Sequence, residues 1–183
     1  LVLGGFVTHE PCLSIAASGV PLHAIAGLGG WLTFTAMGVS YRLLAMFMLA
    51  PELDGWRARA VFYVGTGALA VVILGGAVAI RLGFEIDLVL GLAGVLGLAT
   101  VVLYSADIVH LYRARKRRNI ELNSRMAAFA LVSLAASVAL IVVLAVAGKL
   151  AEHAGAVVFL IAFGWLTGLG LAKLYKIVAF LTW

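Results

Sequence analysis

Residues 126–148 read MAAFALVSLAASVALIVVLAVAG, an apolar stretch that contains no charged side chain. A helix needs about 20 such residues to cross roughly 30 Å of hydrocarbon, because each residue adds about 1.5 Å. Four further stretches meet this requirement, and they cover residues 22–50, 60–82, 86–112 and 155–172. The sequence therefore predicts an all-α, polytopic transmembrane helical bundle with about five full spans.

The composition of the whole chain excludes an ordinary soluble domain. Of its 183 residues, 64% are hydrophobic and 11% are charged, whereas about 25% of the residues are charged in a typical globular domain. A soluble globule of this composition would have too few polar side chains to face water. We expect residues 1–183 to form one transmembrane domain whose main partner is a lipid bilayer.

Both ends of the chain are apolar, which favours a piece of a longer polypeptide. Residues 1–8 (LVLGGFVT) are expected to be the tail of an earlier span. That span would end at His9, Glu10 and Pro11, because proline removes a helical donor and polar groups are costly at mid-membrane.

The basic residues predict the orientation in the membrane. Residues 113–118 (RARKRR) join the third and fourth predicted spans, and short loops rich in Lys and Arg remain in the cytoplasm. With this loop inside, only Arg81 and Lys149 of the 13 basic residues lie outside. The net charge of +5 is therefore concentrated in short loops beside the spans, where it sets the topology and attracts anionic headgroups. Because this role accounts for the basic charge, we expect no nucleic-acid partner.

The four histidines are the candidate ligands of a metal or a haem. The predicted topology places His9, His23 and His153 outside and His110 at the inner end of the third span. Further donor side chains accompany the outer three: Glu10, Cys12 and Glu152. The outer side thus holds the donor types that metal and haem sites use. The alternative for His9 and His153 is that they are solvated loop residues.

His23 is the strongest candidate ligand. The nineteen residues from His23 to Arg42 rise about 28 Å, which puts His23 at the outer edge of the hydrocarbon. Gly27 and Gly30 follow on the same helical face. A histidine above two glycines suits a haem that lies flat against the helix. The alternative is an interfacial histidine, with the glycines allowing close helix packing.

Other small residues and one carboxylate have structural interpretations. Close helix packing is also the simplest role for the remaining small residues of the spans: Gly91, Gly94, Gly97, and the GxxxG pair Gly164 and Gly168. Asp107 lies near the inner end of the third span. Its candidate partners are His110, three residues later, and Arg42, at a similar depth, because opposite charges attract strongly at low dielectric.

Two segments resemble a known group of proteins. Residues 21–31 (PLHAIAGLGGW) and 38–47 (GVSYRLLAMF) resemble the histidine-bearing helix of bacterial multi-span proteins described as cytochrome-oxidase-subunit-I-like. They are also similar to the NnrS-type haem proteins linked to nitric oxide stress. Residues 164–168 (GWLTG) and 173–181 (KLYKIVAFL) resemble the C-terminal helix of this group.

The resemblance implies a bacterial inner-membrane subunit that binds haem b, with His23 as a ligand of the haem iron. Such a subunit would act in electron transfer or nitric oxide chemistry together with other membrane subunits. His9 and His153 are the outer candidates for a second axial ligand. The four histidines of this chain are fewer than an oxygen-reducing subunit needs, so no complete oxidase is implied.

Two alternative functions remain open at this point. One is a cofactor-free accessory or scaffold subunit, and the other is a transporter that uses the outer His and Glu residues as an entry site. The sequence contains no P-loop, GxSxG, HExxH or CxxC motif, which disfavours hydrolytic enzymes.

Overall fold

The computed structural model describes residues 19–20, 22–51, 53, 55–116 and 119–182. These residues form helices joined by short connections, and no strand occurs among them. Within this described part of the chain, five helices are long and apolar enough to cross a membrane. The predicted all-α, multi-span fold class is therefore confirmed. The expected tail of an earlier span, residues 1–8, lies outside the described residues.

The five spans contain both α-helical and wider, π-helical segments. Their bounds are Leu22–Met48, Trp56–Leu82, Ile86–Ala114, Leu122–Val146 and Ala154–Ala179. The first, second and fifth spans are divided into shorter segments: η1 (Ile25–Leu32), α3 (Thr33–Met48), α4 (Trp56–Ala70), η2 (Val71–Gly75), α5 (Gly76–Leu82), α8 (Ala154–Phe159), η3 (Leu160–Thr167) and α9 (Gly168–Leu181). The third and fourth spans are the single helices α6 (Ile86–Ala114) and α7 (Leu122–Val146).

Three helices extend past their predicted bounds by a turn or more, and the extensions carry positive charge. α4 begins at Trp56 instead of residue 60, α7 begins at Leu122 instead of residue 126, and α9 continues to Leu181 instead of ending at residue 172. The added turns carry basic side chains: Arg57, Arg59, Arg125, Lys173 and Lys176. Long Lys and Arg side chains reach headgroups from within a helix, so the helices continue beyond the apolar window.

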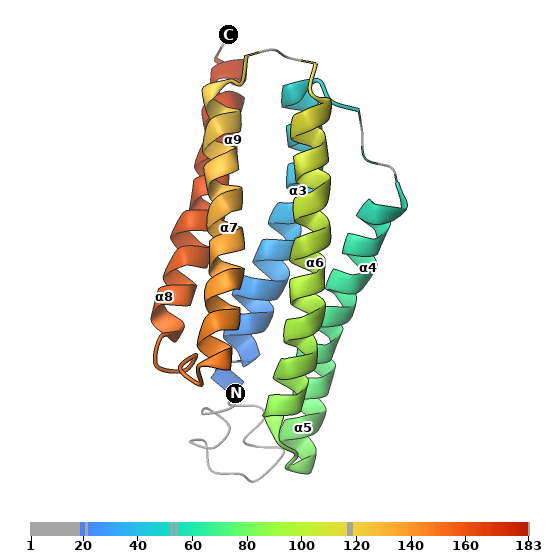
Figure 1. Ribbon diagram of the computed structural model, residues 1–183, viewed down its shortest axis with the longest axis vertical. Coiled ribbons are helices and arrows are strands. Elements are labelled where there is room, and N and C mark those ends of the chain that lie inside the picture. Colours follow the sequence, from blue (N-terminus) through green and yellow to red (C-terminus); the bar gives the residue numbers. More distant parts are fainter. Residues whose placement is uncertain (1–18, 21, 52, 54, 117–118, 183) are drawn as a thin grey trace.

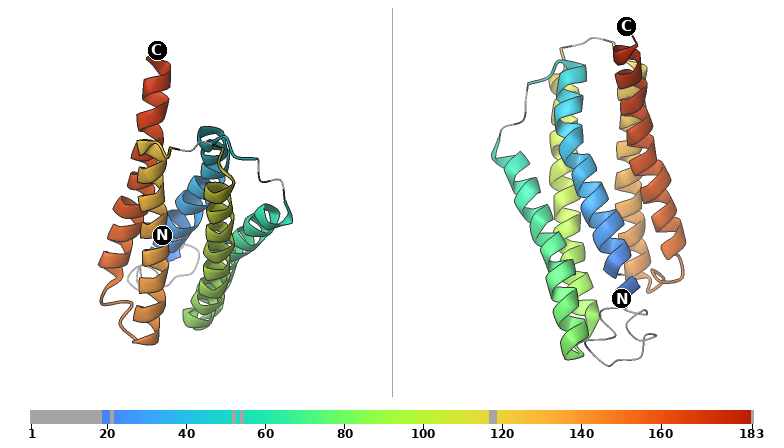
Figure 2. Two further views of the ribbon diagram at one scale, coloured as in Figure 1. Left: turned by 45° about the horizontal axis from the view of Figure 1, so that its top comes forward. Right: turned by 180° about the vertical axis from the view of Figure 1, so that it is seen from behind.

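Successive spans run in opposite directions (Figure 1). What we call the basic end is formed by the end of α3, the end of α6, the start of α7 and the end of α9. The start of α4 is the end of that helix nearer to it, but stands apart from the end of α3 (Figure 1, Figure 2). The last turn of α5, with Arg81, and the turn after α7, with Lys149, lie at the opposite end. This arrangement places the basic residues as the predicted topology requires.

The spans pack as two groups connected by the first span. α4 packs against α6, while α7 packs against η3 and α9. The first span lies between these groups and contacts both, through α3 with α6 and α7 and through η1 with η3 (Figure 1, Figure 2).

The GxxxG pair confirms the predicted role of small residues in helix packing. A Cβ atom added to Gly164 would lie 2.9 Å from Cβ of Ser133, and one added to Gly168 would lie 3.4 Å from Cβ of Ala130. Both contacts are with α7, so the two glycines allow the fifth span to approach it closely. On α6, the space around Gly91, Gly94 and Gly97 is open. These three glycines therefore do not mediate packing within the described bundle.

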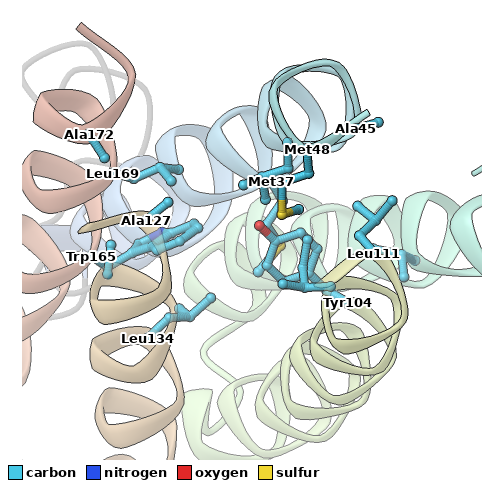
Figure 3. Close-up of a cluster of buried hydrophobic side chains, with 14 residues drawn as sticks. Met37, Ala45, Met48, Tyr104, Leu111, Ala127, Leu134, Trp165, Leu169 and Ala172 are labelled. Carbon is cyan, nitrogen blue, oxygen red and sulfur yellow. The ribbon is translucent and has the colours of Figure 1, made fainter. Parts of the chain in front are cut away.

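A single large cluster of buried side chains joins the spans near the middle and the basic end (Figure 3). Its largest members are the fully buried Trp165 of η3 and Tyr104 of α6. Their rings meet edge to face, with 6.2 Å between the centroids. Aromatic pairs in this arrangement contribute stability beyond the area they bury, so this contact ties the fifth span to the third.

Candidate functional site

His23 lies in the first turn of the first span, at the end opposite the basic end, and its side chain is exposed. Nothing lies within 4 Å of the position that a Cβ atom on Gly27 would occupy. At Gly30, by contrast, the side chain of Leu69 occupies that position. The face below His23 is therefore open for one turn and is then covered by α4.

His153 comes to the same end of the molecule as His23. It caps the N-terminus of α8 and is exposed. The helix that begins there continues into η3, which contacts η1. The structure thus places these two histidines at the starts of neighbouring helices, while His9 lies outside the described residues.

The backbone just after His23 is unusual. Residues Ile25–Leu32 form π-helical turns, and Thr33 Oγ1 donates a 2.8 Å hydrogen bond to the Leu28 carbonyl at their end. A similar segment in the fifth span ends with Thr167 Oγ1 donating to the Ala162 carbonyl at 2.8 Å. Short π-helical segments occur often at functional sites.

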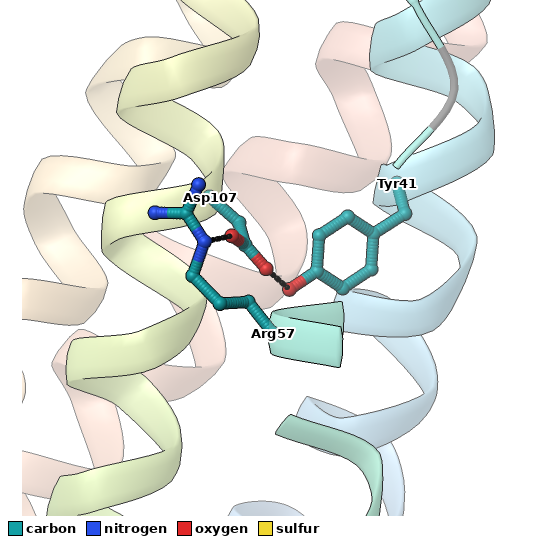
Figure 4. A network of polar contacts seen from close by, with 3 residues as sticks. All are labelled: Tyr41, Arg57 and Asp107. Carbon is teal, nitrogen blue, oxygen red and sulfur yellow. Dashed lines mark hydrogen bonds and ion pairs between the residues drawn. The ribbon is translucent and has the colours of Figure 1, made fainter. Parts of the chain in front are cut away.

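At the basic end, Asp107 of α6 is the centre of a buried polar network (Figure 4). The Tyr41 hydroxyl donates a 3.0 Å hydrogen bond to Asp107 Oδ2. Arg57 Nε lies 3.7 Å from Asp107 Oδ1. The carboxylate side chain is 1% exposed and that of Arg57 is 46% exposed. The network therefore joins α3, α4 and α6 around one charge that is shielded from solvent.

This network corrects two expectations about Asp107. Among the described residues, its ion-pair partner is Arg57 instead of Arg42. His110 is exposed, so it does not share the buried position of Asp107 although it follows three residues later. Sequence reasoning missed Arg57 because this residue precedes the predicted start of the second span.

A second buried contact adjoins the network. Ser40 Oγ lies 2.7 Å from the Met37 carbonyl and 2.5 Å from the Tyr104 hydroxyl. Because the Ser40 proton is directed to the carbonyl, Tyr104 donates to Ser40. The Tyr104 ring also meets Tyr41 edge to face at 5.4 Å, so Tyr41 and Tyr104 together fix α3 against α6.

We expect the Asp107 network to stabilise the bundle in a non-additive way. Arg57→Gln should lower the free energy of unfolding by about 1–3 kcal/mol, because it removes the positive charge beside the buried Asp107 carboxylate. Asp107→Asn removes that charge, so the double variant should lose less than the sum of the single losses. Unfolding in detergent micelles, followed by circular dichroism, measures these differences.

Arg59→Gln provides the matched control for the double-mutant cycle of Arg57 and Asp107. This residue lies two positions after Arg57 on the same helix, and its side chain is exposed. Its replacement should change stability by less than about 0.5 kcal/mol. Strictly additive losses for Arg57→Gln and Asp107→Asn would show that the two side chains do not interact.

The three described histidines do not form a conventional multi-ligand metal site. Within the described part of the chain, no three His, Cys, Asp or Glu residues are grouped so that they could hold a metal ion. A haem differs from such a site because the porphyrin supplies four of the ligands and the protein supplies only axial ones. Two exposed histidines at one end remain compatible with that requirement.

Comparison with known proteins adds no further assignment: no protein-family model, no curated protein and no solved structure matches this chain.

Proposed function

We propose that this chain is a haem-b-binding subunit of a membrane complex, with His23 as an axial ligand of the iron. The observation that carries the proposal is the exposed His23 followed by open space at Gly27. A bound haem supplies one-electron transfer. We place this activity in electron transfer or nitric oxide chemistry of a respiratory-type assembly, as the resemblance of residues 21–31 implies.

The residues around His23 fit a haem at one end of the bundle. The missing side chain of Gly27 leaves room for a flat group beside the helix, and the exposed His153 begins the neighbouring fifth span. Leu69 covers Gly30, three residues after Gly27, so an apolar side chain borders the open turn. In this proposal His23 binds the iron, His153 or His9 supplies the second ligand, and Leu69 limits access of water.

The proposal includes a location and an orientation. The basic end would face the cytoplasm of a bacterial cell and His23 would face the outside, because short loops rich in Arg and Lys are retained in the cytoplasm. Single cysteines introduced at Lys116 and Glu85 should react with a membrane-impermeant thiol reagent from opposite sides in a Cys12→Ser background. Labelling of both positions from one side would contradict this orientation.

A cofactor-free scaffold subunit is the second candidate function, and the surface of α6 favours it. The open space at Gly91, Gly94 and Gly97 would allow a helix of another subunit to approach closely. This candidate predicts a protein without bound chromophore.

A reduced-minus-oxidised absorbance spectrum of the purified full chain distinguishes the two candidates. The haem proposal predicts the paired visible bands of a reduced b-type haem and a haem-to-protein ratio near one. Protein that is folded, expressed with sufficient haem supply and spectroscopically featureless would overturn the haem proposal in favour of a scaffold.

A further inference from the structure

A buried lysine lies near the basic end of the fifth span. Lys173 of α9 is 7% exposed, and its Nζ atom lies 5.5 Å from the centre of the Phe47 ring at the end of α3. Among the described residues, no carboxylate forms an ion pair with Lys173. A buried charge is costly unless an opposite charge or several hydrogen bonds compensate it, and the contact with one aromatic ring compensates only part of that cost.

The packing of α9 against α7 places Lys173 beside the start of α7. The two helices contact each other and run in opposite directions (Figure 1). Gly168 faces Ala130 in this contact, and Lys176 Nζ lies 2.5 Å from Glu121 Oε2. Because Lys173 lies between Gly168 and Lys176, it comes level with the first turn of α7.

The first turn of α7 contains a second buried polar side chain. Asn123 is 2% exposed, and neither its Oδ1 nor its Nδ2 atom has a hydrogen-bond partner among the described residues. The N-cap residue, Glu121, makes no capping hydrogen bond with its side chain. The first backbone N–H groups of α7 therefore lack an acceptor within the helix, and the helix dipole adds partial positive charge at the same point.

The polar groups at this level are mostly donors. The ammonium group of Lys173 offers three N–H bonds and the amide of Asn123 offers two, whereas Oδ1 of Asn123 is the only acceptor of these two side chains. A water molecule between them would supply oxygen lone pairs, but it would leave the charge of Lys173 uncompensated. An anion accepts hydrogen bonds from all of these donors and also neutralises the charge.

We propose that Lys173, Asn123 and the first turn of α7 together bind a small inorganic anion such as chloride. The small size follows from burial, because a bulky anion could not reach two side chains that are at most 7% exposed. Lys176 and Glu121 pair with each other farther out, about 4.5 Å along the helix axis from Lys173. The ion would thus lie about one turn inside the basic end, and it is independent of the haem proposed at His23, at the opposite end.

Chloride binding should stabilise the full chain purified in detergent. Thermal unfolding midpoints are compared in sodium chloride and in sodium gluconate at one ionic strength, because gluconate is too large for a buried site. At a chloride concentration about tenfold above the dissociation constant, the midpoint should be a few degrees higher than in gluconate. The difference should saturate as chloride replaces gluconate.

Two variants test the proposed ligands. Lys173→Met removes the charge and keeps the length of the side chain, so the chloride effect should disappear. In gluconate this variant should be at least as stable as the unaltered protein, because it lacks an uncompensated buried charge. Asn123→Leu should raise the half-saturating chloride concentration about tenfold, since a hydrogen bond to a charged group contributes at least that factor.

Arg125→Gln is the matched control for a general attraction of chloride to the basic end. Arg125 lies two residues after Asn123 on α7 but is exposed, so its replacement should preserve the chloride effect. Line broadening of the chlorine NMR signal detects exchange of chloride with a bound state without relying on stability. The broadening should occur with the unaltered protein and with Arg125→Gln, and it should be absent with Lys173→Met.

Two results would overturn the proposal. One is an unaltered protein whose midpoint is equal in the two salts and which does not broaden the chlorine signal. This result is expected if Glu121 neutralises Lys173 from a longer distance, or if the buried amine is uncharged. The other is an undiminished chloride effect in a Lys173→Met variant that circular dichroism shows to be helical.

Discussion

Replacing His23 with alanine is expected to remove the haem spectrum, or to shift its bands, while the protein still inserts into the membrane. Loss of residues that merely orient a metal ligand lowers metal affinity about 10–100-fold, so loss of the ligand itself should lower haem occupancy at least as much. Insertion should persist because a histidine at the edge of a span contributes little to its hydropathy. The pyridine haemochrome assay of purified protein measures the occupancy.

The matched control for His23 is His110→Ala, because His110 is also exposed but lies near the basic end. The His110→Ala variant should retain the full haem spectrum. Gly27→Leu should lower haem occupancy by filling the open turn, whereas Gly29→Leu adds the same side chain to another open face of that helix. An unaltered spectrum in His23→Ala would reject this ligand assignment even if the protein contains haem.

Replacing Trp165 with alanine is expected to lower the free energy of unfolding by about 3–5 kcal/mol. The side chain is fully buried, and its ring contacts Tyr104 in the centre of the bundle. Helix association within lipid depends mainly on close van der Waals packing, so a cavity at this contact weakens the packing of the fifth span against the third. Thermal or denaturant unfolding in one detergent measures the loss.

Trp165→Phe distinguishes ring packing from hydrogen bonding. The indole Nε1 is buried without a hydrogen-bond partner among the described residues, so phenylalanine removes an uncompensated polar group. Trp165→Phe should therefore lower the free energy of unfolding by less than about 1.5 kcal/mol, the usual limit for conservative core replacements. Trp31→Ala is the exposed control, since Trp31 is 67% exposed. Equal losses for Trp165→Ala and Trp31→Ala would contradict the central role of Trp165.

The number and type of the spans could be predicted because hydrocarbon imposes one requirement on each span separately. A stretch such as 126–148 must satisfy its backbone hydrogen bonds internally, and hydropathy alone identifies it. The helix ends were less predictable. α3 ends where Leu49 adopts a left-handed conformation, with φ of 52°, and α4 begins at Trp56, before its apolar stretch, which brings Arg57 to 3.7 Å from Asp107.

The candidate site was only partly accessible to sequence reasoning. His23 and Gly27 could be placed on one face because helical periodicity is local. The contact between Leu69 and Gly30 could not, because it depends on how the second span packs against the first. The sequence also left open whether Asp107 pairs with Arg42 or His110, and the structure provides Arg57 and Tyr41 instead.

The sequence by itself determined the class of the fold, the number of spans and the concentration of basic residues at one end. Each of these depends on the transfer of a single segment or a single charge between water and lipid. The tertiary structure alone decided which glycines are covered by neighbouring spans and which cation meets Asp107. Those features depend on side chains from different spans, and in lipid many apolar surfaces compete equally for contact.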